Sequence, residues 1–182
     1  MKKVKISIQG NEFLIPSTSI QKCSYDNETY VYMRAKLCAS IIKQYVKKNY
    51  PSLKVWAGSD VYSGGSSVRV EVCNEDGSKV DSSVFDKISE WKHILQGGTF
   101  NGMIDMYESR EDSPSTDKGT PMKYFPSYVF IENKPKWGTP EYWLNQWNEL
   151  KDNYVNSNDF LNQNKTYMTD KEFEKVSNLN LV

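Results

Sequence analysis

The sequence predicts an α+β fold, in which an antiparallel sheet carries helices packed on one face. The first observation is a predicted hairpin in residues 53–76, where valines at every second position of residues 68–72 indicate a half-buried strand. Gly64 and Gly65 provide the turn before that strand, because glycine accepts the positive φ angles of tight hairpins. The second observation is that amphipathic helical patterns stand on both sides of this hairpin. We therefore expect one sheet face that buries both helices.

The other elements are predicted from the same periodicities. Residues 2–9 alternate between apolar and polar like a strand, and residues 12–20 are either its hairpin partner or an irregular crossing. Residues 100–107 indicate a turn and an edge strand, and the aromatic and branched residues at 124–134 indicate a further strand. The helices share an apolar period of 3.6 residues, and they are expected at 28–49, 82–95, 141–154 and 169–176.

The composition fits one folded domain with an extension. The chain has 182 residues, of which 38% are hydrophobic and 13% aromatic, so rings supply much of the expected core. We expect a core domain at 1–138, followed at 139–182 by a helix and an asparagine-rich polar tail. The sequence lacks both the run of roughly 18 apolar residues that a membrane span needs and a signal-peptide block, so we expect the cytosol and no membrane partner.

Little in the sequence points to enzymatic chemistry. The three cysteines, Cys23, Cys38 and Cys73, are far apart and odd in number, which argues for reduced thiols over disulfides or a zinc cluster. The one histidine, His93, lies inside a predicted amphipathic helix, where histidine is usually a boundary residue. We expect no catalytic residues, no metal and no cofactor.

The net charge is zero, but the charge is segregated along the chain. Residues 1–54 contain ten Lys or Arg and three Asp or Glu, whereas residues 55–117 contain five and twelve. Such segregation suggests surfaces that meet charged partners. The alternative is that these faces compensate one another in the folded chain and are only solvated.

The acidic part of the chain contains a predicted binding surface. Asp105, Glu108, Glu111 and Asp112 form an acidic edge that leads into a polar loop at 108–123. We interpret this edge as a surface that imitates nucleic-acid phosphates and occupies a basic groove on a protein partner. The alternative is an ordinary solvated loop.

The basic part of the chain offers candidate nucleic-acid contacts. Lys43, Lys47, Lys48 and Lys54 are suited to bind the phosphates of double-stranded DNA. This interpretation requires them to be exposed and contiguous with the lysines at the N-terminus. A net charge of zero is less typical of a dedicated nucleic-acid binder than a strongly basic chain.

One catalytic pattern stands at the end of the strand predicted at 124–134. Glu132 and Lys134 are two residues apart, so they share a strand face, which is similar to metal-dependent nucleases of the PD-(D/E)XK type. In those enzymes a carboxylate holds magnesium and the lysine assists the attacking water. A second carboxylate would have to come from another strand, and the nearest upstream acids, Asp112 and Asp117, lie in the predicted loop.

Residues 30–134 carry a set of motifs in a fixed order. A helix runs into Asn49-Tyr50-Pro51-Ser52-Leu53, followed by Tyr62-Ser63-Gly64-Gly65-Ser66-Ser67, an Asp76-Gly77 turn, a second helix and Phe100-Asn101-Gly102-Met103. In this order the chain resembles the large polyvalent protein-associated domains of phages and conjugative elements. It departs from that pattern at Val72-Cys73 and Gly77-Ser78, where the family usually has tryptophan-like residues and Gly-Pro.

The resemblance implies a protein carried by a mobile element, and it brings no catalytic residues with it. A short protein of this kind, rich in lysine and asparagine, is similar to the type II anti-CRISPR proteins, which bind Cas9. We therefore expect a non-enzymatic anti-defence protein that binds a CRISPR effector nuclease or another host defence protein. The two alternatives are a DNA-binding accessory protein of the element and a small metal-dependent nuclease using Glu132 and Lys134.

Overall fold

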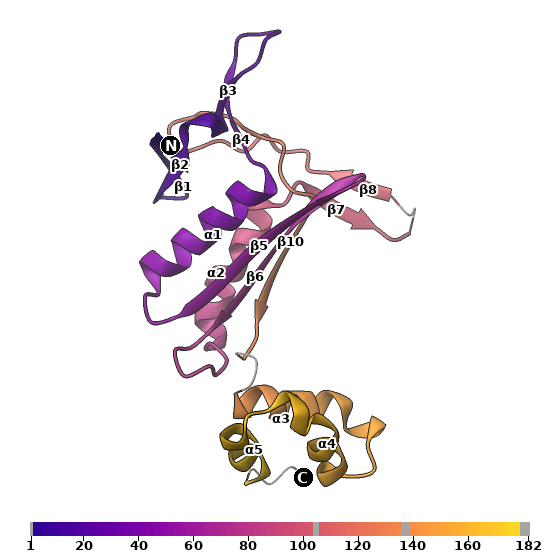
Figure 1. Ribbon diagram of the computed structural model, residues 1–182. Helices are drawn as coiled ribbons and strands as arrows, with labels where there is room; N and C mark the ends of the chain where they lie inside the picture. Colours follow the sequence, from indigo (N-terminus) through magenta and orange to yellow (C-terminus); the bar gives the residue numbers. More distant parts are fainter. Residues whose placement is uncertain (1, 104–105, 136–138, 179–182) are drawn as a thin grey trace.

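The computed structural model describes residues 2–103, 106–135 and 139–178 (Figure 1). The helices are α1 (Ala35–Asn49), α2 (Ser82–Leu95), α3 (Pro140–Leu150), α4 (Ser157–Asn164) and α5 (Asp170–Ser177). The strands are β1 (Lys3–Ile8), β2 (Asn11–Pro16), β3 (Ile20–Lys22), β4 (Thr29–Tyr32), β5 (Lys54–Tyr62), β6 (Gly65–Cys73), β7 (Gly98–Asn101), β8 (Met106–Ser109), β9 (Met122–Lys123) and β10 (Tyr128–Asn133). The predicted α+β class is confirmed.

The central sheet has the strand order β10-β6-β5. β5 and β6 form the predicted antiparallel hairpin, in which Gly64 takes a positive φ of 87° at the turn. β10 instead runs parallel to β6. A parallel neighbour requires a crossover connection, and here α2 and the segments after it return the chain before β10 begins. The sheet is therefore mixed, whereas the sequence predicted antiparallel pairing.

The hydrophobic core lies between one face of this sheet and two helices. Val68, Val70 and Val72 of β6 are almost completely buried, as is Val129 of β10. α1 and α2 both lie on this side of the sheet (Figure 1). They contribute the buried residues Leu37, Cys38, Ile41, Ile42, Val46, Ile88, Trp91 and Leu95.

The hairpin of β1 and β2 closes one end of this core. Phe13 is buried and meets the Trp91 ring edge to face, with ring centroids 5.3 Å apart. Gln44 of α1 fixes the hairpin, because its side-chain amide accepts from the Leu14 N–H at 2.9 Å and donates to the Leu14 carbonyl at 3.1 Å. Of the two predicted fates of residues 12–20, the hairpin partner is confirmed.

The first helix begins later than predicted. Residues 28–34 are not helical, since Thr29–Tyr32 form β4, which pairs with β3 on one side and β9 on the other. Branched and aromatic side chains favour an extended backbone, and the Met33 N–H bonds the Lys123 carbonyl at 2.8 Å. α1 starts at Ala35, once pairing with β9 ends.

The C-terminal helices form a second, separate core. Trp143, Trp147, Phe160, Leu161 and Val176 pack together. In Figure 1, α3, α4 and α5 stand together beyond the lower end of β10. The predicted polar tail thus contains α4 and α5, whose apolar positions hold them against α3. The predicted boundary at residue 138 lies outside the described residues and stays a prediction.

No helix within the described ranges is long and apolar enough to cross a bilayer.

Candidate functional site

The central sheet has a second face that no described helix covers. The cross-strand register places Gly58, Arg69 and Phe130 in one row, and Trp56, Glu71 and Glu132 in the next. These residues alternate with the buried valines, so they point away from α1 and α2. Figure 1 shows both helices on the opposite side of this sheet.

Trp56 lies flat on this open face. Its side chain is 55% exposed, and its Cη2 atom would stand 2.5 Å from a Cβ at position 58. Gly58 therefore provides the space for the indole ring, which a larger residue would displace. Arg69 is exposed beside Gly58 and makes no ion pair within the described part of the chain.

Aromatic rings continue from this face onto the β7–β8 hairpin. Phe130 stacks on Tyr128 with centroids 6.1 Å apart, and Tyr128 meets Tyr107 of β8 edge to face at 5.6 Å. Phe100 lies opposite Tyr107 across the hairpin. We call Trp56, Phe100, Tyr107, Tyr128 and Phe130 the aromatic track.

The ring of Tyr107 is fixed where the hairpin joins the sheet. Its hydroxyl donates to the Ser127 carbonyl at 2.8 Å. Partial burial raises the pKa of Tyr107 above the ordinary tyrosine value, and the neighbouring Tyr128 and Tyr62 hydroxyls act in the same direction. The phenol therefore stays neutral and keeps this hydrogen bond at physiological pH.

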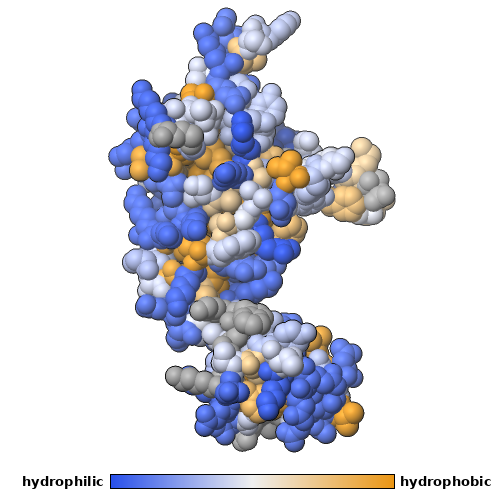
Figure 2. Space-filling view, viewed as in Figure 1, coloured by the Kyte–Doolittle hydropathy of each residue, from blue (hydrophilic) through white to orange (hydrophobic). Residues whose placement is uncertain are grey.

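The β7–β8 hairpin has an apolar tip. Phe100, Met103 and Met106 are 51%, 96% and 60% exposed. In Figure 2 apolar side chains gather on the hairpin, at the right of the view. Flexible methionine side chains adapt to varied protein surfaces, so they are often used in binding sites. The aromatic track thus ends in an exposed group of the kind that protein partners contact.

The open face carries balanced charge. Glu132 lies opposite Glu71 on the neighbouring strand, and Lys134 Nζ is 2.6 Å from Glu132 Oε2 and 3.9 Å from Glu71 Oε1. Lys54, Asp60 and Arg69 complete the charged set, so cations and anions are equal in number. A neutral face is poorly suited to hold a row of phosphates.

Glu71 is the second carboxylate that a nuclease interpretation of Glu132 and Lys134 requires. Sequence reasoning missed it because nothing in the sequence indicates that β10 pairs with β6. The lysine is already ion-paired to both carboxylates. Across the described ranges, no three His, Cys, Asp or Glu residues are grouped so that they could hold a metal ion.

The described residues of the predicted acidic edge differ in their surroundings, and their role as a binding surface stays a prediction. Glu108 lies on the face of the hairpin opposite Tyr107, where it accepts from the Asn101 amide at 2.8 Å. Glu111 is exposed in the following loop. Asp112 is bound by Arg110, whose guanidinium holds the pKa of this carboxyl below its ordinary value. Asp105 lies outside the described residues.

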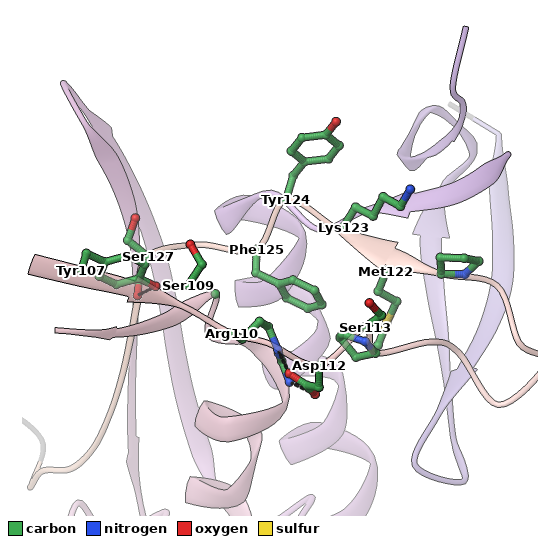
Figure 3. A pocket seen from close by; sticks show the side chains of 13 residues that line it. Tyr107, Ser109, Arg110, Asp112, Ser113, Met122, Lys123, Tyr124, Phe125 and Ser127 are labelled. Atoms are coloured by element: carbon green, nitrogen blue, oxygen red, sulfur yellow. Dashed lines mark hydrogen bonds and ion pairs between the residues drawn. The ribbon is translucent and has the colours of Figure 1, made fainter. Parts of the chain in front are cut away.

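Arg110 is also the centre of a pocket of about 370 Å³ (Figure 3). Its Nη1 donates to the carbonyls of Ile94 and Gln96 at 2.9 and 3.1 Å, which satisfies the C-terminal end of α2. Its guanidinium carbon lies 4.9 Å from the centre of the Phe125 ring. Because these interactions occupy the arginine, this pocket is best understood as a structural junction between α2, β8 and the segment before β10.

Two of the predicted DNA-contacting lysines meet the N-terminal strand. Lys47 and Lys48 of α1 line a groove of about 450 Å³ together with Lys5 and Glu12. Lys5 is paired to Glu12 at 3.2 Å. The other two lysines do not line this groove: Lys43 is half-buried, and Lys54 donates to the Glu75 carbonyl at the end of the central hairpin.

Fold and surface together define a small α+β domain with one sheet face left open. Residues 33–135 match the family described as Large polyvalent protein associated domain 29, and the chain belongs to this family. The match begins just before α1 and ends just after β10, so it includes the central sheet with α1 and α2 and the aromatic track, whereas β1 and β2 lie before it. Membership implies a protein associated with phages or other mobile elements. The chain matches no curated protein and no solved structure.

Proposed function

We propose that this protein is a non-enzymatic anti-defence protein, which binds a CRISPR effector nuclease of the Cas9 type and blocks its engagement or cleavage of DNA. The mobile-element association of the family supports the anti-defence role, because such elements must survive the nucleases of their host. The lysine- and asparagine-rich composition is similar to that of type II anti-CRISPR proteins. The protein would act in the cytosol of the host cell.

The observation that carries the proposal is the aromatic track on the open sheet face. Trp, Tyr and Arg are enriched among the residues that dominate the energy of protein interfaces, because each buries a large contact area. Arg69 lies on the strand between those of Trp56 and Phe130, and these two rings are 55% and 43% exposed. The ion pairs of Lys134 at the border of the track supply a polar rim.

The two exposed acids at the hairpin have a supporting role in this proposal. Glu108 lies on the hairpin face opposite Tyr107 and Glu111 in the loop that follows, and both are exposed, so they would meet basic groups that bind DNA in the effector at the edge of the interface. Charges at the rim of an interface mainly raise the association rate and make it depend on salt. We therefore assign affinity to the aromatic residues and steering to the acids.

Co-elution with a purified Cas9–guide RNA complex tests this assignment. The double variant Trp56→Ala/Phe130→Ala should lose binding by about thirtyfold or more, as interface hot spots do. The double variant Tyr25→Ala/Tyr167→Ala is the matched control, since it removes two rings that are 98% and 63% exposed away from the central sheet. Equal affinity for both variants would exclude the track, provided that both melt like the unchanged protein.

A DNA-binding accessory protein is the second candidate. The groove of Lys5, Lys47 and Lys48 favours it, because these cations come from two elements and stand together. Glu12 in the same groove reduces its positive charge, so we rank this function second.

A further inference from the structure

The central sheet has one open edge, which is formed by β5. The strand order β10-β6-β5 leaves β5 paired on one side alone among the described strands. Its pairing with β6 keeps one register over all nine residues of β5, without a bulge. The strand also contains no proline, which many edge strands use to prevent pairing with another chain. β5 is therefore a long and regular edge.

The outward backbone groups of β5 can be assigned from its partner strand. The Val72 carbonyl of β6 accepts from the Lys134 N–H at 3.2 Å, on the β10 side of β6. In an antiparallel pair, opposite residues either bond each other or both face away, so Val55, which lies opposite Val72, faces outward. The alternation along the strand turns Ala57 and Ser59 outward as well. Their backbone groups make no hydrogen bond with the described residues.

The opposite edge of the sheet is already occupied. On β10 the Val129 N–H donates to Gln96 Oε1 at 3.0 Å. At the other end of this strand, the Asn133 side chain accepts from the Val80 N–H at 2.8 Å and donates to the Val80 carbonyl at 2.7 Å. The segments that flank α2 are thus bonded to β10, whereas no described segment bonds the outer side of β5. An edge left open in this way is suited to pair with a further strand.

The residues of β5 are complementary to a second copy of the same strand. Its charged residues, Lys54 and Asp60, stand symmetrically about Ala57 and on the same open face of the sheet. Asp60 is exposed and forms no ion pair with the described residues. An antiparallel pair of β5 strands centred on Ala57 places each Lys54 opposite the Asp60 of the other copy. It also places each Trp56 opposite a Gly58, so the two indole rings come within reach of each other across the two-fold axis.

We propose that two copies of this chain pair through β5 and form a symmetric dimer, in which the two central sheets become one continuous sheet. This register satisfies the outward backbone groups, because Ala57 pairs with its own copy and Val55 with Ser59. The pair of Lys54 with Asp60 occurs twice, as two-fold symmetry requires. Since an edge interface buries a small area, we expect a weak dimer that depends on concentration. The dimer does not depend on the proposed function, and it joins two aromatic tracks without covering either.

Sedimentation velocity of the full chain, from micromolar to millimolar concentration, measures the monomer–dimer equilibrium. Asp60→Lys should raise the dissociation constant about tenfold or more, because it places like charges opposite each other at two symmetric positions. The exchange variant Lys54→Glu/Asp60→Lys should restore the dimer, since opposite charges again face each other. Asp86→Lys makes the same charge reversal at an exposed position of α2 and should leave the equilibrium unchanged. Thermal melting shows whether each variant is folded.

The proposal is overturned if the unchanged chain stays monomeric up to millimolar concentration. A dimer that Asp60→Lys leaves intact also overturns it, because that dimer uses another surface. A folded exchange variant that fails to dimerise contradicts the register centred on Ala57. A monomer whose binding to the Cas9–guide RNA complex is lost in Asp60→Lys, but not in Asp86→Lys, would assign this edge to a strand of the effector in place of a second copy.

Discussion

Glu132 of β10 lies directly opposite Glu71 of β6, and Lys134 is ion-paired to both carboxylates at 2.6 and 3.9 Å. Two carboxylates in register on neighbouring strands repel one another unless a cation stands between them. Lys134 is that cation, so this group of residues can be explained as a structural ion-pair network.

The network predicts a coupled effect on stability. Lys134→Gln should lower the free energy of unfolding by at most about 1 kcal/mol, because the three side chains are partly exposed to solvent. In the background of Glu71→Gln/Glu132→Gln the same change should have almost no effect, which a double-mutant cycle in urea measures. An equal loss in both backgrounds would show that the lysine acts through some other contact. Cleavage of DNA by the protein with magnesium, abolished by Glu132→Gln, would instead support the nuclease interpretation.

The close pairing of β7 and β8 predicts a glycine requirement. A Cβ at Gly98 would overlap the carbonyl oxygen of Glu108 on the partner strand and would stand 2.8 Å from the Tyr107 ring. Gly98→Ala should therefore destabilise the protein by about 1–3 kcal/mol, the usual cost of overpacking. Gly102→Ala is the control, since its nearest neighbour would be a Phe100 ring atom at 3.9 Å. Similar urea midpoints for the two variants would contradict the described pairing.

The ion pair of Asp112 with Arg110 predicts that the stability of the fold depends on pH. Arg110 holds the pKa of Asp112 below the ordinary value of 3.8 in the folded chain. A depressed folded-state pKa contributes stability above the unfolded value, and this contribution is lost as the pH falls below about 4 through the folded-state pKa. Asp112→Asn should therefore flatten the fall in stability with acid, while Asp86→Asn on the exposed face of α2 should not. Parallel acid profiles for the two variants, measured as urea midpoints, would argue against the Arg110 contact.

DNA binding at the groove lined by Lys5, Lys47 and Lys48 distinguishes the two candidate functions. Under the first, duplex DNA should bind weakly or not at all at physiological salt. Under the second, DNA should bind with an affinity that falls steeply with salt, and Lys5→Gln/Lys47→Gln/Lys48→Gln should flatten that dependence by roughly one unit of slope for each lost contact. Fluorescence anisotropy over a salt series distinguishes these outcomes, with Lys87→Gln as the single-charge control.

The buried side of the fold follows from local sequence patterns. The alternating valines of β6 predicted both the strand and its buried face, and the apolar stripe of α2 predicted its bounds at Ser82 and Leu95. The apolar stripe of α1 predicted too early a start for that helix, because Val31 fits the helical period although Thr29–Tyr32 pair as a strand. The run of branched and aromatic residues at Thr29–Tyr32 was the signal in the sequence that favoured a strand there.

Which residues come together on the open face of the central sheet depends on which strands become neighbours. Trp56 alternates with Val55 and Ala57, so its outward position was readable from the sequence. Phe130 and Glu132 join it only through the parallel pairing of β10 with β6, which links residues 61 apart in sequence at Glu71 and Glu132. No local pattern records that contact. For the acidic residues the sequence shows the cluster but not the partners, since Glu108 accepts from Asn101 and Asp112 is paired with Arg110.

The most direct test is a DNA cleavage assay with purified Cas9, guide RNA and target DNA, with and without this protein. Under the proposed function, cleavage is lost once the protein reaches the concentration of the effector, while a control with protein, DNA and magnesium but no Cas9 leaves the DNA intact. Undiminished cleavage by Cas9 at a large excess of the protein would contradict the proposed inhibition of this effector.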